Sequence, residues 1–301
     1  MTASAVGRYS FGMGKETEKQ GKKGRSGVVV LIIVLVLAAS CAALYFLAFD
    51  TLVFVTDSAY SQVIPAKDIL SLRVHCLFKG VRLRVLRLPD SVFENPATFS
   101  AAVPGMKGSY VLLSPVAAVQ ASRTLTEVSR ILESSVVAAI DADDSRDLFD
   151  ITLVSDDRTA WEKAALALAV QLMPMSQNAA LVYDSQTSFD VKDIIDGFDT
   201  GRLSVFYSDG SRRLFNSETA SKLSELSVVV AMCPHLSGLA DLVRDSGSVS
   251  WIVDYRFAPV VPKENLFGVI IPDLKAAADS LLKTKKGQTQ ILPLEYSYEK
   301  H

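Results

Sequence analysis

Histidine and cysteine are scarce in this chain, and their scarcity removes most metal and nucleophilic chemistry. The 301 residues include three cysteines and three histidines. Cys233 and His235 stand two residues apart, but a structural zinc site needs four ligands. The motifs G-x-S-x-G, G-x-G-x-x-G and the P-loop are absent, and no histidine has neighbours suited to general acid–base work. We therefore expect no enzyme, no metal and no cofactor.

The cysteines that do occur lie in apolar surroundings. Cys41 is part of a long apolar run, and Cys76 and Cys233 each lie in a shorter apolar stretch. A disulfide between Cys76 and Cys233 is one interpretation, and two buried free thiols is the other, which the apolar neighbours favour. The acidic run at 141–147 lacks the glycine and the glutamate of a calcium-binding loop, so we expect a solvated loop there.

An excess of positive charge, which nucleic-acid binding requires, is missing from most of the chain. The first 27 residues hold six basic and two acidic residues, and the remaining residues hold 25 basic and 31 acidic ones. The basic segment 1–27 shows no helix-turn-helix pattern. We therefore expect no nucleic-acid partner and no transcription factor.

The segment 28–49 contains 22 residues without a charge. About 20 apolar residues cross a bilayer as a helix, so this segment predicts one transmembrane helix. The positive tail before it predicts a cytoplasmic N-terminus, with the main domain on the periplasmic side of a bacterial inner membrane. Two alternatives remain open, a cleaved signal peptide and a lipoprotein lipidated at Cys41. All three place the main domain outside the cytoplasm.

After residue 50 the chain alternates short β-rich runs with helical patterns, which predicts an α/β domain with parallel sheets. Helices are expected at 65–80, within 91–103, and at 122–134, 159–172, 191–198, 217–226, 237–244 and 273–283. Strands are expected at 52–56, 81–88, 110–114, 136–140, 151–155, 179–183, 203–207, 228–232, 249–253, 266–271 and 290–294.

The order of these segments resembles the type I periplasmic binding-protein fold of sugar and nucleoside receptors and of the ligand cores of LacI-type repressors. The resemblance rests on four stretches: FDITLVSDDRTAWEKAALALAVQLMPMSQNAALVYDSQ, SVVVAMCPHLSGLADLVRDSGSVSWIVDY, LFGVIIPDLKAAADSLLK and GQTQILPLEYSY. It implies two lobes, with 50–156 and 258–284 in lobe one and 157–257 and 285–298 in lobe two. The run Val253-Asp254-Tyr255-Arg256 departs from the family's glycine–aromatic–aspartate hinge, because it lacks the glycine.

Ligands of open α/β sheets bind beyond the carboxyl ends of the strands, so polar residues at those ends are the candidate ligand-binding groups. The resemblance points most directly to Asp157, Arg158 and Asp254. The same residue types also cap helices and form turns whatever the function. The candidates are Asp57, Ser58, Tyr60, Ser114, Asp157, Arg158, Asp184, His235, Asp254 and Tyr255.

Two functional hypotheses follow from the resemblance. In the first, the domain is a membrane-tethered solute receptor for a small polar ligand of the sugar or nucleoside class, which it passes to an ABC permease. In the second, the fold has lost its pocket and serves as a sensory or protein-interaction module of the cell envelope. An interlobe cleft of roughly 300 Å³ or more favours the receptor, and a cleft filled by bulky side chains favours the module.

Overall fold

The computed structural model describes residues 27–40, 49–141, 148–172, 178–184, 203–208, 217–232 and 238–300. The chain divides into two units at the junction of Phe49 and Asp50. In the first unit, residues 27–40 form a helix. No helix among the described residues is both long and apolar enough to span a membrane. Residues 41–48 of the expected 28–49 segment, Cys41 included, lie outside the description, so the transmembrane segment stays a prediction.

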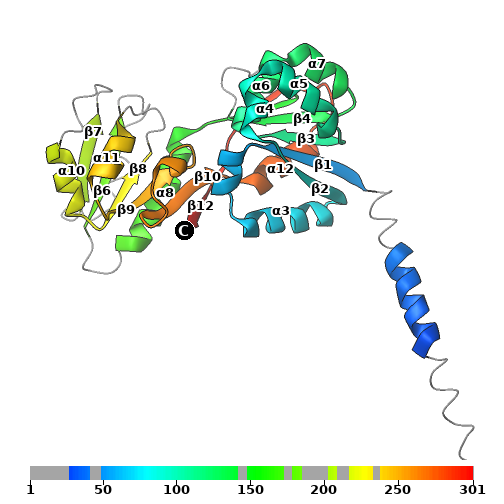
Figure 1. Cartoon of the computed structure of the whole chain (residues 1–301), viewed down its shortest axis with the longest axis horizontal. Coiled ribbons are helices and arrows are strands. Elements are labelled where there is room, and N and C mark those ends of the chain that lie inside the picture. Colours follow the sequence, from blue (N-terminus) through cyan, green and yellow to red (C-terminus); the bar gives the residue numbers. More distant parts are fainter. Residues whose placement is uncertain are drawn as a thin grey trace, which may run out of the picture. The chain divides into compact units, whose positions relative to one another are not determined.

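The second unit is α/β and contains two six-stranded sheets (Figure 1). The first sheet has the order β11-β5-β4-β3-β1-β2, and all of its strands run parallel. Its strands are β1 (Asp50–Thr56), β2 (Val81–Arg87), β3 (Tyr110–Leu113), β4 (Val136–Ile140), β5 (Ile151–Val154) and β11 (Gln290–Pro293).

The second sheet has the order β12-β10-β9-β8-β6-β7, and it is parallel except for β12, which pairs antiparallel with β10. Its strands are β6 (Ala179–Asp184), β7 (Leu203–Ser208), β8 (Val228–Ala231), β9 (Ser250–Asp254), β10 (Leu266–Pro272) and β12 (Tyr296–Lys300). We call each sheet with its helices a lobe, and the expected two-lobed architecture is confirmed.

Helices cover the first sheet on both faces (Figure 1). The helices of lobe one are α2 (Ser58–Val63), α3 (Ala66–Phe78), α4 (Asp90–Glu94), α5 (Pro96–Ala102), α6 (Pro115–Arg123), α7 (Leu125–Ile131) and α12 (Leu274–Lys283), with the 3-10 turn η1 (Val103–Met106). Lobe two holds α8 (Asp157–Leu172), α10 (Ser217–Ser224), α11 (Leu239–Asp245) and the 3-10 turn η4 (Ala258–Val260).

The strand β1 lies inside its sheet between β3 and β2, and its sequence is a continuous apolar run because both of its faces are covered. Leu52 and Phe54 pack into one hydrophobic cluster, and Val53 and Val55 pack into a second cluster on the opposite face of the sheet. All four side chains are fully buried. A strand that is covered by helices on both faces has no solvent-exposed face, so apolar and polar residues do not alternate along it.

Two strands near the end of the chain belong to the opposite lobe from the one that we expected. The strand at 266–271 was expected in lobe one, but β10 pairs with β9 in lobe two. The strand at 290–294 was expected in lobe two, but β11 pairs with β5 in lobe one. The intervening α12 packs on β3 and β4 of lobe one, as expected. An unbroken apolar strand fits the interior of either sheet, so its pattern alone could not assign it.

Three elements differ from the sequence predictions. The antiparallel strand β12 was missed, because its polar composition resembles a tail more than a strand. The short helix α2 was also missed. One helix was expected at 122–134, but the structure has two helices in this part of the chain. The first, α6, ends at Arg123, and the second, α7, begins at Leu125, with Thr124 between them. The helix expected at 191–198 lies outside the described residues.

The chain crosses between the lobes three times, and the crossing segments are bonded to one another. The crossings follow β5, β10 and β11. The backbone N–H of Asp273 donates to the carbonyl of Glu295 at 2.8 Å, which joins the second crossing to the third. The hydroxyls of Ser155 and Tyr296 lie 2.8 Å apart, which joins the first crossing to the third. The three segments therefore form one joint between the lobes.

Candidate functional site

The carboxyl ends of the first sheet bring Asp57 and Ser114 together. Asp57 follows β1 and caps α2, because its Oδ1 accepts from the backbone N–H of Tyr60 at 2.8 Å. Its Oδ2 accepts from the Ser114 hydroxyl at 3.1 Å. Ser114 follows β3 and caps α6 through the N–H of Ala117. Both predicted residues therefore lie at the predicted edge, where they also carry the capping role of such residue types.

At the carboxyl end of β9, Asp254 binds Arg256 tightly. Asp254 Oδ1 accepts from the backbone N–H and from Nε of Arg256 at 2.9 and 2.8 Å, and Oδ2 accepts from Nη2 at 3.2 Å. Asp254 is buried. Burial opposes the charge on Arg256, but the neighbouring Asp254 outweighs it and raises the pKa of the guanidinium. A buried ion pair with several hydrogen bonds compensates for its loss of hydration.

Asp141 of lobe one joins this pair from the opposite side. Its Oδ2 accepts from the Tyr255 hydroxyl at 2.5 Å and lies 3.5 Å from Nη1 of Arg256. The residue directly follows β4 and has a φ of 52°, the only positive φ recorded for a non-glycine residue of the described chain. Aspartate tolerates this left-handed conformation better than most residues, although at some cost. Asp141 is therefore held in an uncommon conformation by two partners from lobe two.

Aromatic rings close the same region. Tyr60 of α2 packs edge-on against Tyr255, with ring centroids 5.3 Å apart and planes at 82°. Desolvation by burial, followed by the charge of Asp141, raises the pKa of both phenols well above the ordinary value. The Tyr60 hydroxyl is buried and has no hydrogen-bond partner among the described residues. A buried hydroxyl without a partner is costly, so this position would gain from a ligand or water oxygen.

A cavity of about 240 Å³ lies where these residues from both lobes meet. The face from lobe one includes Asp57 and Tyr60, and the face from lobe two includes Tyr255 and Arg256. Its lining combines two aromatic rings with one carboxylate and one guanidinium, and these are the groups that orient small polar ligands. The other lining residues are Ala59, Pro115, Val116 and Pro259.

The remaining predicted residues do not join this cavity within the described structure. The backbone N–H of Ser58 donates to Asp90 at 3.2 Å. Arg158 is exposed on α8, where its Nε lies 3.2 Å from Glu162. Asp157 and Asp184 are described by their backbone only, and His235 lies outside the described residues.

Sequence reasoning missed Asp141 and undervalued Arg256. Asp141 directly follows an apolar strand, which is the same signal that selected Asp57 and Asp254. Its membership of an acidic run led us to expect a solvated loop instead. Arg256 stands at the predicted strand end, but its bond to Asp254 depends on a turn that the sequence pattern does not specify. Cys76 is a free, buried thiol as expected, while Cys233 lies outside the description.

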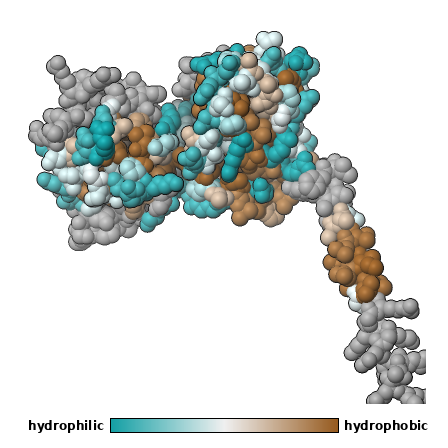
Figure 2. Space-filling view, viewed as in Figure 1, coloured by the Kyte–Doolittle hydropathy of each residue, from teal (hydrophilic) through white to brown (hydrophobic). Residues whose placement is uncertain are grey.

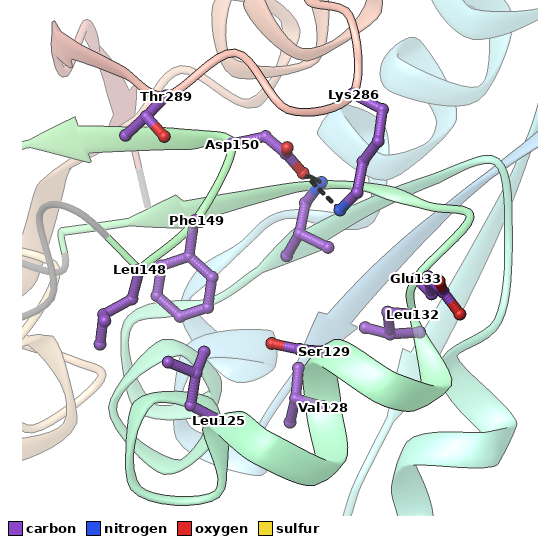
Figure 3. Close-up of a pocket in the computed structure, with 11 residues that line it drawn as sticks. Leu125, Val128, Ser129, Leu132, Glu133, Leu148, Phe149, Asp150, Lys286 and Thr289 are labelled. Atoms are coloured by element: carbon purple, nitrogen blue, oxygen red, sulfur yellow. Dashed lines mark hydrogen bonds and ion pairs between the residues drawn. The ribbon is translucent and has the colours of Figure 1, made fainter.

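A second cavity of about 320 Å³ lies in lobe one at the amino ends of its strands (Figure 3). Its polar centre is Asp150, which accepts from the N–H of Val137 at 2.9 Å, from Nζ of Lys286 at 3.0 Å and from the N–H of Gly287 at 2.9 Å. Leu125, Val128 and Phe149 line the apolar side. Because its carboxylate is already occupied by three donors, Asp150 joins β4 to the segment before β11.

No group of three or more histidine, cysteine, aspartate or glutamate side chains among the described residues is arranged to hold a metal ion. No protein-family model and no curated protein matches the chain.

Solved structures that match include a mutant XylFII–LytSN complex (14% identity, 84% of this chain, 98% of that chain, TM-score 0.48). They also include the arabinose-binding protein AraP from Geobacillus stearothermophilus (13%, 84%, 97%, 0.48) and an ABC transporter solute-binding protein from Conexibacter woesei (11%, 83%, 88%, 0.49). At these identities the likeness concerns the fold alone.

Proposed function

We propose that residues 50–300 form a solute-binding domain that takes a small polar ligand of the sugar or nucleoside class between its lobes. The observation that carries this proposal is the buried Tyr60 hydroxyl, which lacks a partner among the described residues and belongs to a ring lining the interlobe cavity. A ligand hydroxyl would supply that partner. Asp57 and Arg256 would then contribute an acceptor and donors from opposite sides.

The proposal includes the apolar segment 28–49 as a membrane tether, with the domain on the extracytoplasmic side. Its support is the length of the uncharged run and the basic residues that precede it. A tethered receptor needs no cofactor, because an ABC permease that accepts the solute would provide the energy through its own ATPase.

A second candidate function is favoured by one specific observation. Asp141 and Asp254 are already paired with Arg256, whose side chain also lines the interlobe cavity. A ligand would have to displace or share these bonds. If no solute can displace or share the bonds among Asp141, Asp254 and Arg256, the domain acts as a sensory or protein-interaction module of the envelope.

The test is a thermal-shift panel on the full chain with sugars, nucleosides, amino acids and polyamines. A ligand at about 100 times its dissociation constant stabilises the fold by roughly 2.7 kcal/mol, which moves the melting temperature by several degrees. We expect one class of solute to produce a shift. A flat panel from a cooperatively folded protein would reject the receptor and favour the interaction module.

Matched variants locate the site once a ligand is found. Asp57→Asn and Arg256→Gln should weaken binding by about 1–3 kcal/mol, because each removes a charged partner from the cavity. Arg158→Gln is the control, since this arginine is exposed on α8 and pairs with Glu162. Equal weakening by Arg158→Gln would instead place the site at the carboxyl end of β5, one of the strand ends where the sequence analysis expected ligand-binding residues.

A further inference from the structure

Helix α3 carries apolar side chains on two opposite faces. Leu72 and Cys76 are fully buried against lobe one. The opposite face exposes four apolar residues, at positions that recur along one side of a helix. This outer face of α3 consists of Leu70, Val74, Leu77 and Phe78, with exposed fractions of 59%, 45%, 46% and 86%.

These four residues form a patch and are not scattered singly. Figure 2 shows apolar residues gathered over the part of lobe one where Figure 1 places α3. Isolated exposed leucines or valines are ordinary on protein surfaces, whereas a contiguous apolar patch marks a surface that contacts something else. A solvated outer face would carry polar residues at these positions. The composition of α3 therefore indicates an apolar or interfacial contact.

The position of this face in the fold indicates what it contacts. Helix α3 ends at Phe78, and Lys79 and Gly80 line the same cavity as Asp50, the first residue of β1. Asp50 is also paired in register with Val81. The uncharged segment 28–49 leads into Asp50 without any polar linker. The end of α3 that carries Phe78 is therefore close, within the domain, to the residue that directly follows the segment 28–49.

The charges around the outer face agree with a lipid surface. Arg73 is exposed along the helix beside the apolar residues, and Lys67 is exposed as well but forms an ion pair with Glu299. Asp68, the helix's one acidic residue, lines a separate cavity together with Glu299. Basic residues beside leucine and phenylalanine are the composition of helices that lie in the interface of anionic membranes.

We propose that the outer face of α3 lies against the lipid surface of the membrane that holds segment 28–49, with Leu77 and Phe78 in the headgroup region. This inference rests on the membrane tether of the proposed function. It adds that the domain contacts the bilayer directly, which would fix lobe one to the membrane while lobe two stays free to move about the joint.

The test uses the full chain in vesicles of phosphatidylethanolamine and phosphatidylglycerol, with ordinary or brominated acyl chains. Bromine quenches tryptophan on contact, and both native tryptophans, Trp161 and Trp251, are buried in lobe two. Phe78→Trp places a reporter on the outer face of α3. Leu166→Trp, at a position on α8 that is 65% exposed, is the matched control.

We expect brominated lipid to remove most of the added emission of Phe78→Trp and to leave that of Leu166→Trp unchanged. Equal quenching of both reporters, or of neither, overturns the inference. Flotation of the vesicles separates the two levels of failure. A chain that floats with its Phe78→Trp reporter unquenched refutes only the contact of α3, and another protein surface then covers that face. A chain that does not float refutes both the tether and the contact.

Discussion

The hydroxyl of Tyr255 donates to the Asp141 carboxylate at 2.5 Å, across 114 residues of sequence. Tyr255 follows the last residue of β9 in lobe two, and Asp141 follows β4 in lobe one. One hydrogen bond therefore connects the carboxyl ends of the two sheets. Hydrogen bonds to carboxylate acceptors are shorter and stronger than those between neutral groups.

Asp141→Asn and Tyr255→Phe should each lower the free energy of unfolding by about 1–3 kcal/mol, because each removes part of a bond to a charged group. The double variant should lose less than the sum of the two single losses, since the variants share one interaction. Urea denaturation of the three variants measures this coupling. Strict additivity would show that the bond does not hold the lobes together. Glu162→Gln is the control, and its exposed ion pair is worth at most about 1 kcal/mol.

Tyr60→Phe should raise the stability of the ligand-free protein by about 1 kcal/mol, because it removes a buried hydroxyl that has no partner among the described residues. The same change should weaken the binding of any solute that occupies the interlobe cavity. Melting temperatures with and without ligand separate the two effects. A loss of stability without ligand would mean that the hydroxyl is already bonded, for example to an ordered water.

Stability should fall at alkaline pH. Burial raises the folded-state pKa of Tyr60 and Tyr255 above the usual value near 10, as it does for Tyr296. Below that value the phenols are neutral in both states, so their burial imposes no pH dependence. Above about pH 10 the unfolded phenols ionise while the folded ones stay neutral, and stability is lost progressively until the folded pKa is passed. Tyrosinate absorbance should therefore rise in two phases, with the second phase coinciding with unfolding. A single phase in the native protein would contradict this.

Asp150→Asn should destabilise lobe one by about 3 kcal/mol, because it places an amide opposite donors that now serve a buried carboxylate. Lys286→Met should cost at most about 1 kcal/mol, since the ammonium is half exposed and exposed pairs contribute little. Chemical denaturation of the two variants gives the comparison. Equal losses would mean that the ion pair, and not the two backbone N–H groups, makes Asp150 important.

Strand–helix alternation was sufficient to predict an α/β domain with parallel sheets, and the resemblance to the binding-protein fold implied the two lobes. Neither predicted the pairing of the strands at the end of the chain. The run LFGVIIP is apolar throughout, so it predicted a buried strand correctly without indicating its neighbour. Its partner is decided by contacts such as Val269 with Val253, which are distant in sequence. The strand β12 was not predicted because its sequence is largely polar, and an antiparallel strand at the edge of a sheet tolerates polar residues.

The candidate site was predictable where one residue type at a strand end is sufficient evidence. The positions of Asp57, Ser114 and Asp254 at strand ends were predicted in this way, and their binding of a ligand stays a prediction. Asp141 was missed because its role depends on a partner from the other lobe and on a left-handed backbone. Neither feature leaves a local pattern in the sequence.

The exchange of the last strands determines when each lobe is completed during synthesis. Sheet one lacks its covering helix α12 and its strand β11 until residues 274–293 have been made, although β5 ends at Val154. Sheet two likewise receives β12 last, at its edge beside β10. A nascent chain therefore lacks the outermost strand at one edge of each sheet until residues 290–300 have been made. Neither sheet has its full set of strands before β11 and β12 are made, so we expect the two lobes to complete their folding together.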